Sequence, residues 1–468
     1  MNLFNITALA AVIFAAPILA SNSIIPVSKE TQEMAASLRD KAIKDDSAYE
    51  ILKSLTTEVG ARHPGTPGEK AGIEWGIKKL KALGFDKVYS EDVEMNGWVR
   101  GVETAEILVP SYQKMTISAL GRSKSTPKGG LEAPIVHFAN YAELEKAADG
   151  SLKGKIAFIS NRMERFQDGA GYGPANIARS KGHELAAQKG AEALLIRSIG
   201  TDDHRNPHTG ATNVAMGYTM VPAVALSNPD ADQLVRLIEY GHKPKIRLNI
   251  QTKDLGPIVT KNVIGEITGR ELPDEVVVIG GHLDSWDLGT GAVDDGAGVA
   301  IAMATAALIK NNTQQRPRRT IRVILWGAEE LGLIGARAYA KAREADGTIA
   351  KHVIGSESDF GAGPVYGLQS SDNVSPNALH VVDSMAALMG ELGVTRRSGN
   401  TTGGPDMMPL AALGVPALNL MQDGTDYFDL HHTPDDTFDK VNPEHMRQNV
   451  AAWIVFTYIA AEWPGSFK

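Results

Sequence analysis

Histidine and acidic residues that could bind a metal ion occupy five short segments between residues 282 and 432. Three segments directly follow an apolar run that predicts a buried strand, and the other two lie in loops a short way beyond one. Because side chains at strand ends can meet in space, these groups are expected to surround one point, as a divalent cation requires. The candidate ligands are His282, Asp294, one of Glu329 and Glu330, Asp359, and one of His431 and His432.

Five such ligands are more than one tetrahedral zinc ion uses. They suit two cations that share a bridging carboxylate, polarise a carbonyl oxygen and hold a shared hydroxide. The short acidic loop 289–298, which is rich in glycine, can place Asp294 between the two cations.

Neighbouring residues at a strand end point in different directions, so Glu329 and Glu330 are predicted to have different roles. One binds a metal, and the other stays free as a general base that takes a proton from water and passes it to a leaving amine. Asp284, two residues after His282, is predicted to fix the imidazole.

Apolar strand patterns alternate with helical patterns in the half of the chain that carries these residues. Such alternation predicts an α/β fold with a doubly wound, mostly parallel sheet covered by helices on both faces. Ligands of such sheets collect beyond the carboxyl ends of the strands. The predicted strands are 276–280, 320–326, 352–358 and 415–421, and the helices are 298–310, 333–345, 376–389 and one from Asn442 to about Trp463.

The chain has 468 residues, enough for two domains, and the section 105–255 reads as a smaller α/β unit of its own. The net charge of −8 argues against nucleic acid as a partner. The absence of cysteine excludes disulfides and thiolate ligands.

The first twenty residues predict a cleaved signal peptide, and an N-terminal anchor or a buried helix is the alternative, because no Lys or Arg precedes the apolar run. The uncharged apolar run 6–20 is too short to span a bilayer and ends in a sequence typical of a cleavage site before Ser21. We therefore expect a periplasmic or secreted protein that has no membrane association after signal cleavage.

Five motifs resemble those of the co-catalytic two-zinc metallopeptidases of the aminopeptidase/glutamate carboxypeptidase type, above all the plasma glutamate carboxypeptidases (carboxypeptidase Q). They read GHLDSWDLGTGAVDDGAG, LWGAEELG, ESDFGAG, GGPDMMPLAALGVPALNL and HHTPDDT. The resemblance covers about 35–465. It implies a zinc exopeptidase-like fold with the signal peptide at 1–20, the first part of the peptidase domain at 21–104, a protease-associated-like insert at 105–255 and the metal-binding part at 256–468.

By this resemblance, His282 and Asp359 would bind one zinc ion, and Glu330 and His432 the other. Asp294 would bridge the two ions, and the peptide bond after it would be cis. Glu329 would be the general base. A homodimer is expected by analogy alone.

The resemblance also suggests residues near a peptide substrate. Gly404, Asp406 and Tyr427 match family positions of this kind. His208 lies in a Pro-His-Thr-Gly sequence of the insert that could reach the substrate, although an ordinary polar loop explains it equally well.

The function that this implies is zinc-dependent hydrolysis of dipeptides or short peptides. An aminopeptidase that acts on longer peptides is the alternative. Two remote alternatives are a binding protein on a catalytically dead peptidase scaffold and a glutaminyl cyclase, which would use one zinc ion.

Overall fold

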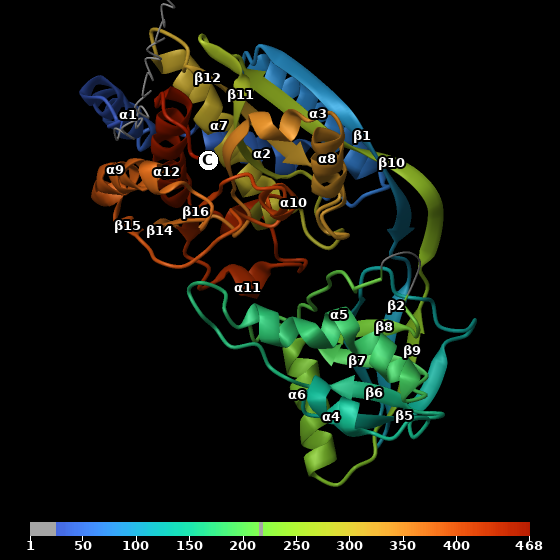
Figure 1. Ribbon diagram of the computed structural model, residues 1–468. Helices are drawn as coiled ribbons and strands as arrows, with labels where there is room; N and C mark the ends of the chain where they lie inside the picture. Colours follow the sequence, from blue (N-terminus) through green and yellow to red (C-terminus); the bar gives the residue numbers. More distant parts are fainter. Residues whose placement is uncertain (1–24, 215–218) are drawn as a thin grey trace, which may run out of the picture.

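The computed structural model describes residues 25–214 and 219–468, which form two α/β units joined by a long two-stranded ribbon (Figure 1). The predicted signal peptide at 1–20 lies outside the described residues. The ribbon consists of β1 (Lys87–Val99) and β10 (Lys253–Ile267), which pair antiparallel along their length.

The larger unit contains a five-stranded sheet in the order β1-β10-β12-β11-β13. β11 pairs in parallel with β12 and β13, whereas β10 pairs antiparallel with β12 and β1. The α/β class is therefore confirmed, but the sheet is mixed rather than mostly parallel, because the ribbon adds two antiparallel pairings. The three parallel strands are β11 (Leu272–His282), β12 (Arg319–Trp326) and β13 (His352–Glu357).

Alternate residues of β11 face different helix layers, as the two-residue period of a strand requires. Val277 and Ile279 belong to the core that contains α7 and α12, whereas Val276 and Val278 pack with α8 and α10. The helices of this unit are α1 (Lys29–Ala42), α2 (Ser47–Glu58), α3 (Pro67–Ala82), α7 (Ala297–Asn312), α8 (Ile334–Ala345), α9 (Leu379–Met389), α10 (Met408–Ala412), α11 (Tyr427–Leu430) and α12 (Pro443–Glu462).

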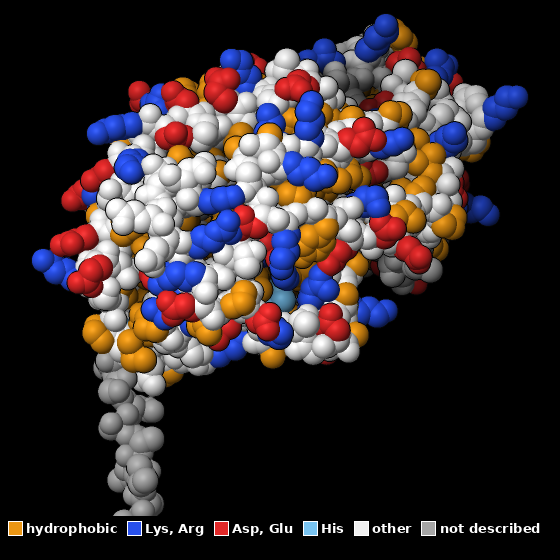
Figure 2. Space-filling model, turned by 90° about the horizontal axis from the view of Figure 1, so that it is seen from above, with side chains coloured by type: hydrophobic (Ala, Val, Ile, Leu, Met, Phe, Trp, Pro, Cys, Tyr) orange, Lys and Arg blue, Asp and Glu red, His pale blue; other side chains and the backbone are white. Residues whose placement is uncertain are grey.

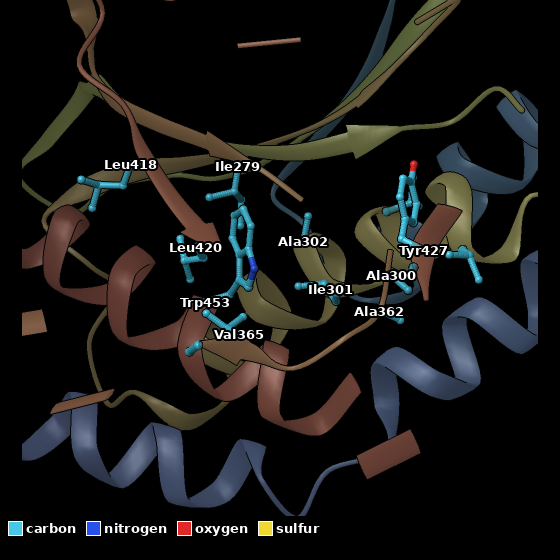
Figure 3. Close-up of a cluster of buried hydrophobic side chains, with 14 of the residues drawn as sticks. Ile279, Ala300, Ile301, Ala302, Ala362, Val365, Leu418, Leu420, Tyr427 and Trp453 are labelled. Carbon is cyan, nitrogen blue, oxygen red and sulfur yellow. The ribbon is translucent and has the colours of Figure 1, made fainter. Parts of the chain in front are cut away.

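Helix α7 lies in the middle of the larger core. The segment Ala292–Asn312 is apolar and long enough to cross a membrane, but its most apolar stretch of 18 residues is 94% buried within the protein, as in the core helix of a globular domain. In the same core, Trp453 of α12 lies among Ile279, Leu420 and Val365 (Figure 3).

A three-stranded sheet extends this unit. Its order is β15-β14-β16, and an isolated bridge from Gly355 to Ala417 connects it to β13. The strands are β14 (Val365–Ser370), β15 (Thr395–Arg396) and β16 (Leu418–Gln422).

The smaller unit, here called the insert, is built on an eight-stranded sheet within residues 103–250 that has its own apolar core. Its order is β3-β2-β9-β5-β6-β7-β8-β4, with helices against it (Figure 1). The elements are β2 (Glu103–Val109), β3 (Gln113–Met115), β4 (Ile117–Ala119), β5 (Leu131–Phe138), α4 (Tyr141–Lys146), β6 (Ile156–Ile159), α5 (Tyr172–Gln188), β7 (Ala193–Arg197), β8 (Ala223–Leu226), α6 (Asn228–Glu239) and β9 (Lys245–Ile250).

Candidate metal centre

Asp294 lies between two histidines, each of which faces one of its carboxylate oxygens. Asp294 Oδ1 is 3.0 Å from His282 Nε2, and Asp294 Oδ2 is 3.2 Å from His432 Nε2. A further carboxylate accompanies each histidine. Asp359 Oδ1 lies 3.6 Å from His282 Nε2, and Glu330 Oε2 lies 3.0 Å from His432 Nε2. The structure thus brings the five residues together in two sets of three that share Asp294.

Adjacent parallel strands deliver three of these residues to one edge of the sheet. His282 ends β11, Glu330 follows β12, and Asp359 follows β13. All three therefore lie at or beyond the carboxyl ends of neighbouring strands, where α/β sheets bind their ligands.

Loops supply the other two residues. Asp294 lies in the short turn between β11 and α7, and its peptide bond to Asp295 is cis. His432 follows α11 and adopts a left-handed backbone conformation with φ of 62°. Its neighbour His431 stacks on it with ring centroids 3.5 Å apart, and His431 Nε2 is 3.7 Å from Asp294 Oδ2.

A metal ion fits the unsatisfied oxygens of this cluster. Asp294 Oδ2 and Glu330 Oε1 are buried and accept no hydrogen bond. Buried polar atoms without partners require an explanation, and a cation bound between these two oxygens would satisfy both. Imidazole nitrogens combined with carboxylate oxygens are a donor set that suits zinc, whereas magnesium and calcium prefer oxygen alone.

The pKa shifts of these residues also show that positive charge is stabilised in this cluster. Burial alone would lower the pKa of His432, but Glu330 and Asp294 outweigh it and raise that pKa to about 9. Burial would raise the pKa of Asp294, yet the imidazoles of His282 and His432 beside its two oxygens hold that pKa well below its usual range. Protons on the histidines thus occupy the place of a cation, and a metal ion would displace them.

Glu329 and Glu330 lie in different environments. The carboxylate of Glu330 contacts His432, whereas that of Glu329 is half-buried and makes no hydrogen bond or ion pair with another described residue. Burial raises the pKa of Glu329 well above its usual range. A raised pKa makes a carboxylate a better acceptor for a proton and lets it return that proton afterwards.

Asp284 holds this pair through the backbone. Its Oδ1 accepts the N–H of Glu329 at 3.0 Å, and its Oδ2 accepts the N–H of Glu330 at 3.3 Å. His282 Nδ1 donates instead to the main-chain carbonyl of Asp284 at 2.9 Å, and the carboxylate of Asp284 lies 3.8 Å from that nitrogen. The predicted contact to the imidazole is therefore made by the main chain of Asp284, and its side chain orients the two glutamates.

Three further residues, which the sequence does not single out as functional, hold the loop that carries Asp294. The carboxylate of Asp436 accepts the backbone N–H groups of residues 292–294. Arg62 is fully buried and donates to the carbonyls of residues 283, 290 and 291. Asp295 accepts the N–H of His282 at 3.0 Å. The only signal for Arg62 is its place in the turn-rich loop 60–68.

Two of the predicted substrate residues line cavities beside the metal centre. Gly404 lines a cavity of about 220 Å³ together with Asp359 and Tyr366. Tyr427 lines a second cavity of about 460 Å³. Phe360 belongs to both and lies between them.

The other two predicted substrate residues are buried. Asp406 is fully buried, and its N–H donates to Glu357 Oε2 at 2.6 Å. His208 is 1% exposed, and its Nδ1 bonds to the carbonyl of His431 at 2.7 Å. Neither side chain is free to contact a substrate, because each is enclosed by the protein.

The insert forms one wall of the site. Asp168 of the insert lines the same cavity as Gly404. Arg165 forms an ion pair of 2.7 Å with Asp429 of α11, the helix that faces the insert in Figure 1. A substrate at the metal centre would therefore lie between the two units.

Comparisons with known proteins agree with this geometry. Residues 262–457 match the model of peptidase family M28. Mouse carboxypeptidase Q is 34% identical over 415 residues, which are 89% of this chain and 86% of the relative. A solved peptidase M28 precursor from Shewanella amazonensis is 46% identical, with a TM-score of 0.90 over 94% of this chain and 98% of that chain. A zinc aminopeptidase from Bacillus subtilis shares the fold, with a TM-score of 0.64 at 20% identity over 89% of this chain and 95% of that chain.

The identity to carboxypeptidase Q extends over both units, and the family match covers all five residues of the cluster. The chain therefore belongs to peptidase family M28, a family of metallopeptidases.

Proposed function

We propose that the protein is an exported exopeptidase that uses two zinc ions per chain to hydrolyse dipeptides or short peptides with free termini. The observation that supports this most strongly is the carboxylate of Asp294 between His282 and His432, at 3.0 and 3.2 Å. The name and the coverage of the carboxypeptidase Q relatives support an exopeptidase.

Each ion has its own residues and shares one with the other ion. His282 and Asp359 would hold one zinc, Glu330 and His432 the other, and Asp294 both. When bound, a zinc pair supplies Lewis acidity that activates water and polarises the scissile carbonyl.

Glu329 is the general base of the proposed reaction. Its carboxylate takes a proton from the attacking water and donates it to the leaving nitrogen, so the peptide C–N bond breaks without release of a free amide anion. Asp284 keeps it in place by holding its N–H at 3.0 Å. Its raised pKa suits a group that must both accept and donate.

The space around the centre favours small substrates. The two cavities, about 220 and 460 Å³, are at or below the size of ordinary small-molecule pockets. Lys and Arg side chains are mixed with Asp and Glu over the face in Figure 2. The mixed charge on this face offers no broad basic surface to a nucleic acid.

A metal count combined with a peptide panel tests this proposal. We expect two zinc ions per chain by mass spectrometry and hydrolysis of dipeptides. N-acetylated dipeptides, dipeptide amides and pentapeptides should be cleaved slowly, because they lack a free terminus or exceed the cavities. Rapid release of the first residue from pentapeptides would instead support an aminopeptidase, the second candidate, which the solved zinc aminopeptidases favour. One zinc ion with cyclisation of N-terminal glutamine would support a glutaminyl cyclase.

A side chain at Gly404 is expected to reduce both stability and activity. Gly404 has a φ of 121°, and an added Cβ would lie 2.6 Å from Glu357 Cβ, at the base of the smaller cavity. We expect Gly404→Ala to lower the free energy of unfolding by roughly 1–3 kcal/mol beyond the backbone cost and to reduce dipeptide turnover. Urea unfolding and kcat/KM measure both effects.

Gly414→Ala is the matched control, since Gly414 also has a positive φ, 87°, but an added Cβ would meet no atom within 4 Å. It should show only the backbone cost of about 1–2 kcal/mol and normal turnover. Equal losses in both variants would contradict a steric role for Gly404.

A further inference from the structure

The insert contacts the loop of His432 from the side away from Asp294. Thr209 donates its N–H to the carbonyl of His432 at 3.1 Å, and its own carbonyl accepts a hydrogen bond from His432 Nδ1 at 3.2 Å. The second bond leaves His432 Nε2 without its proton when the ring is neutral, free to bind a cation.

This double contact holds a backbone conformation that residues with side chains rarely adopt. His432 has a φ of 62°, in the left-handed region. Because the amino acid itself does not favour this conformation, its surroundings must impose it. One hydrogen bond with Thr209 is made by the main chain of His432 and the other by its ring. Together they fix the backbone conformation of His432 and the direction of its imidazole.

Thr209 is itself anchored within the insert. Its Oγ1 donates to the carbonyl of Ala119 at 2.8 Å and accepts from Arg100 at 3.0 Å. The side chain of Thr209 is therefore held by groups outside the loop of His432.

The neighbouring residue, His208, makes the second connection. Its Nδ1 lies 2.7 Å from the carbonyl of His431, and its Nε2 lies 2.7 Å from Asp202 Oδ1. The ring is therefore held between the main-chain carbonyl of His431 and the carboxylate of Asp202. The side chains of His208 and Asp202 are 0% exposed.

The pair is tightly enclosed. Asp202 Oδ1 also accepts from Asn228 at 3.1 Å, and Asp202 Oδ2 accepts the N–H of His204 at 3.0 Å. A Cβ on Gly200 would lie 2.2 Å from His208 Nε2, so the ring packs directly on this glycine. These contacts leave the ring of His208 one orientation, toward His431.

We infer that the insert completes the metal site formed by Glu330 and His432, here called the second site. The buried Asp202–His208 pair and the backbone of Thr209 act as positioning groups for the ligand His432. This inference rests on the proposed two-zinc function. His208 thereby has a role in metal binding, although it touches neither metal nor substrate. The first site, at His282 and Asp359, lacks these contacts and should not depend on the insert in this way.

The test compares zinc binding in the full-length wild type and in His208→Ala and Asp202→Asn variants. Each protein is loaded with zinc and titrated with dipicolinate, and bound zinc is counted by mass spectrometry. We expect both variants to keep one zinc ion with wild-type affinity and to bind the other about 10–100-fold more weakly. Asp202→Asn retains the shape of the side chain, so it reports the lost charge even if His208→Ala folds poorly.

His204→Gln is the matched control, because His204 lies on the same loop with an exposed side chain. It should bind both ions normally. Thermal unfolding of the zinc-free proteins separates the alternatives, since a purely structural role would lower the unfolding temperature and leave zinc affinity unchanged, which would overturn the inference. Two ions bound equally tightly in wild type and both variants would also overturn it. A wild type that binds fewer than two ions would instead contradict the proposed function.

Discussion

Glu329→Gln is expected to reduce kcat for a dipeptide by about 10²–10⁴-fold while both zinc ions stay bound. The amide keeps the size and the backbone contact of Glu329 to Asp284 but can no longer take a proton from water. Zinc should stay bound, because the carboxylate of Glu329 makes no contact with a metal-binding residue. KM should also change little. Steady-state kinetics and zinc content of the same preparation provide the measurement.

Two further variants define the result. Glu344→Gln removes an exposed glutamate of α8 and should leave both quantities unchanged. Glu330→Gln should lose zinc, because Glu330 lies 3.0 Å from His432. Activity of Glu329→Gln near the wild-type value would exclude Glu329 as the base, and loss of zinc from this variant would make it a ligand.

Asp294→Ala is expected to lose both zinc ions and with them the peptidase activity. Its two oxygens face His282 and His432, so no other residue of the cluster serves both sets. A Lewis acid contributes several kcal/mol to such reactions, so we expect a fall in kcat/KM of at least about 10³-fold. Zinc is counted after dialysis, and circular dichroism shows whether the fold persists.

Asp359→Ala is the variant with which the zinc content of Asp294→Ala is compared. Asp359 lies 3.6 Å from His282 and belongs to one set only, so its loss should release one ion and keep the other. An Asp294→Ala variant that still binds two ions would refute a bridging role.

Local patterns predict much of the fold. The predicted helices 298–310 and 333–345 correspond to α7 and α8, and the predicted strand 320–326 corresponds to β12. The long strands β1 and β10 do not follow from such patterns. Charged and polar residues interrupt the apolar positions of both strands, and Gly256-Pro257 interrupts β10, so neither has the continuous apolar run that indicates a buried strand. Pairing with each other, and not local composition, makes these segments strands.

The candidate ligands could be found from the sequence because metal-binding side chains have recognisable types and follow predicted strands. Apart from Asp284, the groups that hold them could not be found in this way. Thr209 contacts His432 through backbone atoms 223 residues away in the chain, and every residue type has such atoms. Arg62 acts likewise on three main-chain carbonyls. Only the folded chain shows which peptide groups lie within reach.

The two paired strands that lead into and out of the insert attach it to the larger unit at one place. Val99 at the end of β1 lies opposite Lys253 at the start of β10, so the chain leaves and returns at the same place. A rotation of the insert about this ribbon would widen the space between the two units. It would also displace His432, which is hydrogen-bonded to Thr209. Entry of a peptide and the positioning of His432 would then be coupled, and a substitution that makes the ribbon more rigid would affect both.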